Sequence, residues 1–175
     1  MKIRYTISIY TENNVGLLNR ISAIFLKRHI NIISITSSES EITDIFRFII
    51  VVDVDENQII KLIRQIEKQI EVISAFYHTN DEIIYLETAL YKVKSESLFK
   101  ERQIQNIIKE SRANMVTVKP EFFVIEKTGW REETEELYEK LKPYGLMQFV
   151  RSGRISVSKN SMEISKLLNI KKNYE

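Results

Sequence analysis

Residues 9–20 read IYTENNVGLLNR, and this stretch joins an apolar run to the start of a helical pattern. The apolar run, residues 3–9, ends at polar residues, and apolar residues at helical spacing begin at Leu17. Asn14 is a good helix N-cap, because its side-chain oxygen can accept hydrogen bonds from first-turn amides. Gly16 lets another group approach those amides closely. Since helix N-termini attract anions, the turn is predicted to bind a carboxylate, and an ordinary capped turn is the alternative.

The composition indicates a globular protein with few special features. The chain has 175 residues, 43% of them hydrophobic and 29% charged, with a formal net charge of +2 and no cysteine. This charge is too small to indicate binding to nucleic acid or to an anionic membrane. The first residues lack the apolar core of a signal peptide, and no segment approaches the roughly 20 apolar residues of a membrane helix. We therefore expect a cytoplasmic protein that binds neither nucleic acid nor membranes.

The first half of the chain has the order strand, helix, strand, strand, helix, strand. The expected strands are residues 2–10, 31–38, 45–54 and 72–77. The first helix begins at Leu17. The second follows Asp55, which forms a capping-box pattern with Gln58 and precedes an apolar face that runs from Ile59 to Ile70. This βαββαβ order is typical of the ferredoxin-like fold.

The second half repeats this order after a polar boundary at residues 79–82. The expected strands are residues 84–93, 115–118, 122–126, 147–151 and 154–157, and the expected helices are residues 98–111 and 130–141. The last two strands form a hairpin in this interpretation. We therefore predict an α+β protein with two consecutive ferredoxin-like βαββαβ domains, residues 2–78 and 84–158, followed by a tail, residues 159–175. In this tail we expect a short helix from Met162 onward.

The sequence contains little that indicates catalysis. His29 and His78 lie at the ends of expected elements, away from any cluster with the spacing of metal ligands. Neither the glycine-rich phosphate loop nor the G-x-S-x-G nucleophile turn is present. The glutamates of residues 132–136 have the pattern of a solvated helix face. We therefore predict neither a catalytic residue nor a metal site.

Four segments resemble those of a known family. Residues 12–20, ENNVGLLNR, are similar to E-N-x-x-G-x-L-x-R, and residues 25–32, FLKRHINI, to F-x-x-R-G-Y-N-I. Residues 87–93, ETALYKV, are similar to E-x-x-L-x-K-V, and residues 150–158, VRSGRISVS, to A-R-S-G-x-x-x-x-S. The first two segments resemble an ACT domain. All four together resemble the small regulatory subunit of acetolactate synthase (acetohydroxyacid synthase). One departure is His29, where the family usually has glycine.

The resemblance implies a site for an amino-acid effector between the ACT domains of a homodimer. In such a site, amides of the turn in one chain would hold the α-carboxylate. Side-chain oxygens of Asn13 and Asn31 would accept from the α-ammonium, and Leu17, Ile32 and Ile33 would form an apolar wall. The implied effector-binding residues are Asn13, Val15, Gly16, Leu17, Asn31, Ile32 and Ile33.

The resemblance also implies a function and a partner. The chain would activate the large catalytic subunit of acetolactate synthase and confer feedback inhibition by a branched-chain amino acid, valine above all. Thiamine diphosphate, magnesium and FAD are expected only in that partner. Two alternatives are a stand-alone amino-acid sensor of the ACT type that acts on another enzyme, and a transcription factor with an ACT-like sensing half. The second alternative needs a DNA-reading element, and no expected helix has a basic face.

Overall fold

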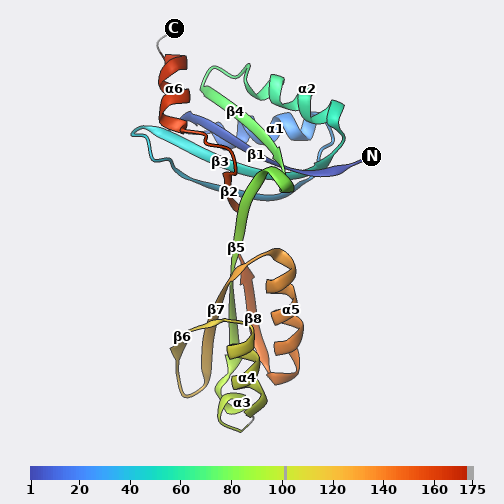
Figure 1. Cartoon of the computed structure of the whole chain (residues 1–175), viewed down its shortest axis with the longest axis vertical. Helices are drawn as coiled ribbons and strands as arrows, with labels where there is room; N and C mark the ends of the chain where they lie inside the picture. Colours follow the sequence, from blue (N-terminus) through green and yellow to red (C-terminus); the bar gives the residue numbers. More distant parts are fainter. Residues whose placement is uncertain (101, 173–175) are drawn as a thin grey trace. The chain divides into compact units, whose positions relative to one another are not determined.

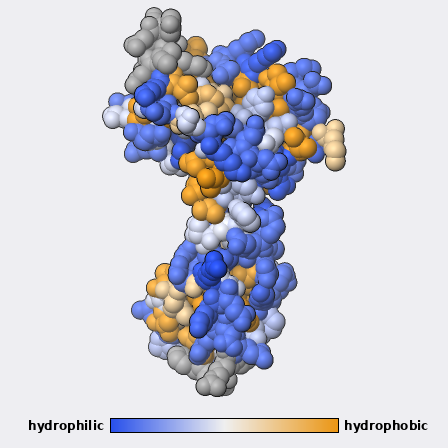
Figure 2. Space-filling view, viewed as in Figure 1, coloured by the Kyte–Doolittle hydropathy of each residue, from blue (hydrophilic) through white to orange (hydrophobic). Residues whose placement is uncertain are grey.

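The computed structural model describes residues 1–100 and 102–172 of the chain. They form two compact units (Figure 1). The first unit contains residues 1–85 and the C-terminal segment from Arg154 onward, and the second contains residues 86–153. The face of each unit that Figure 2 shows is mostly hydrophilic, with scattered apolar patches. No helix in the described ranges is long and apolar enough to cross a membrane.

The first unit is a four-stranded antiparallel sheet with two helices on one face (Figure 1). Its elements are β1 (Ile3–Glu12), α1 (Leu17–Lys27), β2 (Ile32–Glu39), β3 (Ile45–Val54), α2 (Glu56–Ile66) and β4 (Val72–Thr79). The strand order is β2-β3-β1-β4. This is the predicted ferredoxin-like arrangement.

Strand alternation decides what each face of this sheet contacts. Ile7 and Ile9 of β1 are fully buried in the core, which the helices complete with Ile21, Phe25 and Leu62. Because successive strand side chains point to opposite faces, the residues between them on β1 face away from α1 and α2. The sheet of the first unit therefore has an apolar face toward α1 and α2, and its opposite face has polar side chains.

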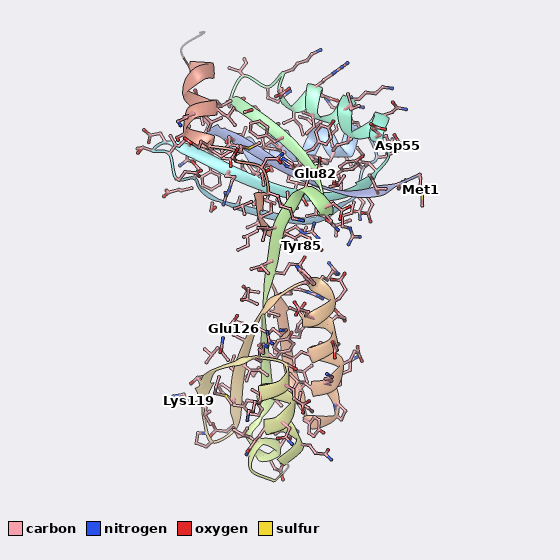
Figure 3. The ribbon with its side chains drawn as sticks, in the orientation of Figure 1. Met1, Asp55, Glu82, Tyr85, Lys119 and Glu126 are labelled. Carbon is pink, nitrogen blue, oxygen red and sulfur yellow. The ribbon has the colours of Figure 1, made fainter. Side chains whose placement is uncertain are left out.

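Helix α2 begins as predicted but ends earlier. Asp55 lies at the start of this helix (Figure 3). It accepts a hydrogen bond from the Gln58 amide at 2.8 Å, and the Gln58 side chain accepts from the Asp55 amide at 3.2 Å. This reciprocal capping box satisfies two amides at the start of the helix. The prediction that Ile70 continues the apolar face is wrong. The helix ends at Ile66, and Ile70 is 98% exposed.

The second unit repeats the order of the first. Its elements are β5 (Ile83–Lys94), which begins in the first unit, α3 (Ser95–Lys100), α4 (Arg102–Glu110), β6 (Asn114–Val118), β7 (Phe122–Gly129), α5 (Arg131–Leu141) and β8 (Leu146–Arg151). The strand order is β6-β7-β5-β8, again ferredoxin-like. The core contains the buried ring of Tyr91, whose hydroxyl donates to the Thr134 carbonyl at 2.7 Å. Two consecutive domains of this fold class are thus confirmed.

The C-terminal segment differs from the prediction. β9 (Ile155–Ser158) pairs with β5 rather than with β8, so the predicted hairpin is wrong. α6 (Ile164–Lys172) then packs on the first unit through Leu168, which lies in an apolar cluster with Tyr10 and Ile45. Residues 154–172 thus pack on the first unit, whereas the predicted second domain extended to residue 158 with a separate tail after it.

Arg154 holds this segment on the first unit. Its side chain is 3% exposed, and its Nη1 donates to Thr6 Oγ1 at 2.9 Å and to Asn80 Oδ1 at 2.8 Å. The guanidinium also lies 3.7 Å from the centre of the Tyr85 ring. A buried cation needs such partners, because burial removes its hydration. The segment after the second unit is therefore fixed by specific contacts.

Helix α1 ends with a left-handed residue. The His29 amide donates to the Leu26 carbonyl and the Ile30 amide to the Phe25 carbonyl, both at 3.0 Å. This is the Schellman pattern, whose C′ position prefers glycine. His29 occupies it with φ of 53°, a conformation that crowds the Cβ of an L residue.

Replacing His29 by glycine is therefore expected to stabilise the protein. His29→Gly should raise the free energy of unfolding by about 0.5–1 kcal/mol, because glycine adopts positive φ without the Cβ clash. Urea denaturation followed by circular dichroism measures this difference. Lys27→Gly, within α1, is the matched control and should destabilise by up to about 1 kcal/mol. Equal destabilisation by both variants would contradict the assignment of strain at His29.

Candidate effector site

The turn between β1 and α1 is built around Gly16. Gly16 is the N-cap of α1, with φ of 84° and ψ of 0°, and its carbonyl accepts from the amides of Asn19 and Arg20 at 3.1 and 3.3 Å. The prediction that Asn14 caps the helix is wrong. Its side-chain nitrogen donates to the Glu12 carboxylate at 3.1 Å instead. A positive φ favours glycine at this position, so the conformation of the turn depends on Gly16.

The start of α1 is open to a ligand, although the Leu17 and Asn19 amides already donate to the carbonyls of Asn14 and Gly16 at 3.4 and 3.1 Å. Within the described part of the chain, no side chain caps α1, and no acidic residue occupies its first turn. No atom outside the adjoining residues lies within 4 Å of where a Cβ on Gly16 would stand, and Val15 is 100% exposed. First-turn amides without an acceptor carry partial positive charge and attract carboxylates. The turn can therefore receive an anion.

The turn is anchored to the neighbouring strand. Glu12 at the end of β1 donates its amide to the Glu71 carbonyl at 3.0 Å, and Arg20 of α1 forms an ion pair with the Glu71 carboxylate. Since Glu71 directly precedes β4, these contacts connect the helix start to the central and edge strands. The amides are thus held in place before any ligand binds.

The residues predicted for the other part of the site gather at the start of β2. Asn31 and Ile33 line a pocket of about 230 Å³ beside His29. Ile33 lies at a register shift between β2 and β3, and such bulges re-aim side chains. Ile32 is half-buried and packs against the core.

The structure adds residues to this pocket that the sequence analysis missed. Lys2, Asp53 and Gln58 also line it. Arg4 donates to both carboxylate oxygens of Asp53 at 2.9 and 2.8 Å, and these bonds hold the Asp53 pKa below its usual value. These residues come from the start of β1, the end of β3 and the start of α2. No short motif joins them, and only strand pairing places them beside Asn31.

Within one chain the two parts of the predicted site do not meet. Glu12, next to the turn, pairs with Ile45 of β3, whereas Ile32 pairs with Val52 at the opposite end of that strand. Asn13, Val15 and Gly16 therefore lie at one end of the sheet. Asn31, Ile32 and Ile33 lie at the other end.

The side chain of Leu17 does not belong to the surface of the turn. Leu17 is 4% exposed and packs in the core of the first unit. As the first residue of an amphipathic helix, it faces inward with Ile21 and Phe25. Its predicted role as an apolar wall is therefore corrected, and its amide donates to the Asn14 carbonyl at 3.4 Å.

Among the described residues, no three or more histidine, cysteine or acidic side chains come together in a way that could hold a metal ion.

Comparison with known proteins covers nearly the whole chain. Residues 5–71 match the ACT domain family, and residues 86–160 match the family described as the small subunit of acetolactate synthase. The acetolactate synthase small subunit of Bacillus subtilis is 37% identical over 158 residues, which cover 90% of this chain and 91% of that protein. That of Mycolicibacterium smegmatis is 34% identical over 155 residues, covering 89% and 91%.

A solved structure agrees with these matches. The crystal structure of the acetolactate synthase small subunit from Thermotoga maritima superposes with a TM-score of 0.82 at 25% identity, covering 91% of this chain and 99% of that one. The similarity therefore extends over both units and is not limited to the ACT fold. The chain belongs to the family of acetolactate synthase small subunits, which are regulatory rather than catalytic, and its first unit contains the ACT domain.

Proposed function

We propose that this chain activates the thiamine-diphosphate-dependent catalytic subunit of acetolactate synthase and makes it sensitive to a branched-chain amino acid, valine above all. The observation that carries the proposal is the full-length similarity to small subunits, combined with an open turn whose amides can bind a carboxylate. Thiamine diphosphate, magnesium and FAD belong to the catalytic partner in this proposal. The complex acts in the cytoplasm, in the synthesis of valine, leucine and isoleucine.

Each group of the effector has a candidate partner. The α-carboxylate accepts from amides near Val15 and Gly16, where no side chain caps the start of α1. The α-ammonium donates to side-chain oxygens of Asn13 and of Asn31 from a second chain, both of which are exposed. The branched side chain contacts Ile33. The effector therefore needs residues from both ends of the sheet.

A homodimer through β2 would supply them. β2 lies at the edge of the sheet, and its sequence, IISITSSE, contains no lysine, arginine or proline to discourage further pairing. β1 and β2 run in the same direction, because each is antiparallel to β3. Antiparallel pairing of two β2 strands about a two-fold axis would bring the turn of one chain near Asn31 of the other.

Regulation then follows from differential affinity. The small subunit activates its partner by binding the active conformation more tightly than the inactive one. An effector that binds between two ACT domains favours one arrangement of the dimer, and its effect on the enzyme is limited to a coupling free energy of about 1–3 kcal/mol.

The dimer can be tested at Ile35, an exposed residue of β2. Ile35→Lys should shift the protein from dimer to monomer at micromolar concentration, because a charged side chain on an edge strand opposes pairing. Light scattering measures the mass. Ile70→Lys, a fully exposed position outside the strands, is the control and should leave the dimer intact. A monomeric wild-type protein would rule out this assembly, and a dimer that survives Ile35→Lys would place the interface elsewhere.

The effector site can be tested at Gly16. Gly16→Asp should weaken valine binding roughly tenfold or more, because its carboxylate would repel the ligand carboxylate and positive φ strains the side chain. Isothermal titration calorimetry measures the affinity. Gly16→Asn is the matched control, since asparagine tolerates this conformation and adds no charge, and it should retain more of the binding. Unchanged affinity in Gly16→Asp would remove the site from the turn.

Activation can be tested by reconstitution. The isolated chain should form no acetolactate, and its addition to the catalytic subunit should raise the rate of acetolactate formation and make that rate sensitive to valine. Co-purification and a rate assay with and without valine measure both effects. A catalytic subunit that is equally active with and without the chain, and gains no inhibition by valine, would favour the stand-alone sensor instead.

A further inference from the structure

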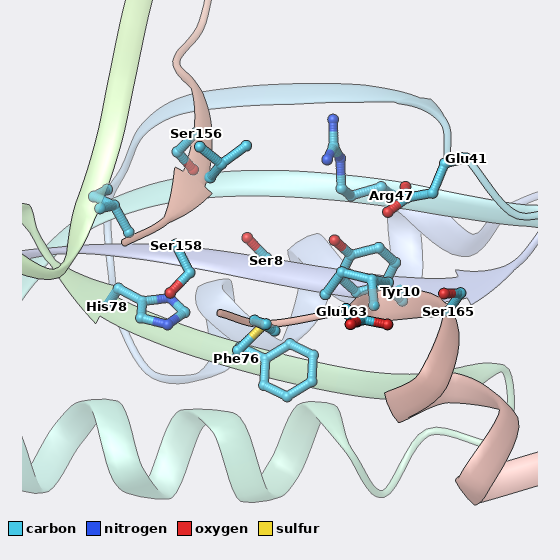
Figure 4. Close-up of a pocket in the computed structure, with 14 residues that line it drawn as sticks. Ser8, Tyr10, Glu41, Arg47, Phe76, His78, Ser156, Ser158, Glu163 and Ser165 are labelled. Atoms are coloured by element: carbon cyan, nitrogen blue, oxygen red, sulfur yellow. The ribbon is translucent and has the colours of Figure 1, made fainter. Parts of the chain in front are cut away.

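The first unit contains a second pocket that shares no residue with the turn or with the start of β2. Its volume is about 330 Å³, and it lies where the C-terminal segment packs over β1, β3 and β4 (Figure 4). This volume falls in the range of small-molecule sites, about 300–1,000 Å³. Because every lining residue belongs to the first unit, the pocket is complete within one chain.

Strand alternation gives the pocket a polar floor. Ser8 and Tyr10 of β1 point away from α1 and α2, because Ile7 and Ile9 point toward them. Tyr10 pairs across the strands with Arg47 of β3, which also lines the pocket. A tyrosine hydroxyl and a guanidinium thus stand side by side on this face.

The C-terminal segment closes the pocket from the other side. Ser156 and Ser158 of β9 lie near one end of the pocket, and Glu163 and Ser165 lie near the other (Figure 4). Phe76, Met162 and Ile164 add apolar wall. The segment is held in place by Arg154 and by Leu168, so the wall is a fixed part of the fold.

The charges in this pocket are only partly paired. Within the residues that the structure describes, Arg47 forms no ion pair, and its buried Nε has no acceptor. Burial raises the pKa of Tyr10, and the hydrogen bond and charge of Arg47 oppose that rise. Glu41 lines the same pocket without an ion pair to Arg47, and Glu163 pairs with Lys166 at 2.6 Å. A cation and a carboxylate that share a pocket without contact leave room for a molecule between them.

We propose that this pocket is a second binding site, for an α-amino acid with an apolar side chain. The α-carboxylate would bind Arg47 and the Tyr10 hydroxyl, since arginine forms paired hydrogen bonds with carboxylates. The α-ammonium would bind Glu41, and the side chain would contact Phe76, Met162 and Ile164. A simple anion would be repelled by the carboxylates and a simple cation by Arg47, whereas a zwitterion satisfies both.

The test uses the full-length ¹⁵N-labelled chain with Gly16→Asp, which blocks the turn and leaves this pocket unchanged. Valine, leucine, methionine and phenylalanine are added singly as probes, and amide chemical shifts are followed. At least one probe should give saturable shifts at Ser8, Tyr10, Ser158 and Ser165. Shifts at residues 13–17 in the unmodified chain report separately on binding at the turn. The two proposed sites can therefore be supported or contradicted independently. If none of the probes shifts the pocket amides, the proposal is overturned.

Variants and a second ligand test the roles of the two charges. Arg47→Met should weaken binding roughly tenfold or more, whereas Arg64→Met, on the exposed face of α2, should leave it unchanged. Glu41→Gln should also weaken binding, and because Glu41 is exposed this variant should fold even if Arg47→Met does not. 4-Methylpentanoate, which is leucine without its ammonium group, should bind weakly. Equal binding of this acid, or equal affinity in Glu41→Gln and wild type, would contradict a zwitterion site.

Discussion

The burial of Ile7 and Ile9 of β1 against α1 and α2 is the contact on which both sites depend. Both side chains are fully buried, and full burial of such a residue stabilises by about 1.5–3 kcal/mol. These two residues fix the register of β1. They therefore also fix where the strand ends and which of its side chains point away from the helices. A shift by one residue would bury Ser8 and expose both isoleucines, so the register is strongly determined.

The end of β1 and its outer face offer different groups to a ligand. After its end, Gly16 turns the chain into α1 and leaves the start of the helix without a side-chain cap, which suits a carboxylate. On its outer face, Tyr10 stands beside Arg47 under a C-terminal segment that Arg154 holds in place. The first site would be completed by another copy of the chain. The second is complete in one chain, so the two differ in their dependence on assembly.

Most of the fold could be predicted from periodicity. The apolar pattern predicts β3 with its observed bounds, and Asp55 and Gln58 alone indicate the capping box. The wrong predictions concern segments whose local pattern is compatible with more than one structure. Asn14 has the chemistry of an N-cap, but the positive φ of Gly16 moves the cap two residues further along. Residues 154–157 have the pattern of a hairpin partner for β8, but β9 pairs with β5 instead.

The sequence by itself determined the two βαββαβ repeats and the turn of Asn13, Val15 and Gly16, because these depend on spacing over a few residues. Only the tertiary structure decided that Asn31 lies at the far end of the sheet from that turn, since this distance follows from strand pairing. It also decided that Leu17 is in the core and that Arg47, Glu41 and Glu163 share a pocket. Glu41 and Arg47 precede the second unit in the sequence, whereas Glu163 follows it. No local pattern records which distant side chains a folded sheet brings together.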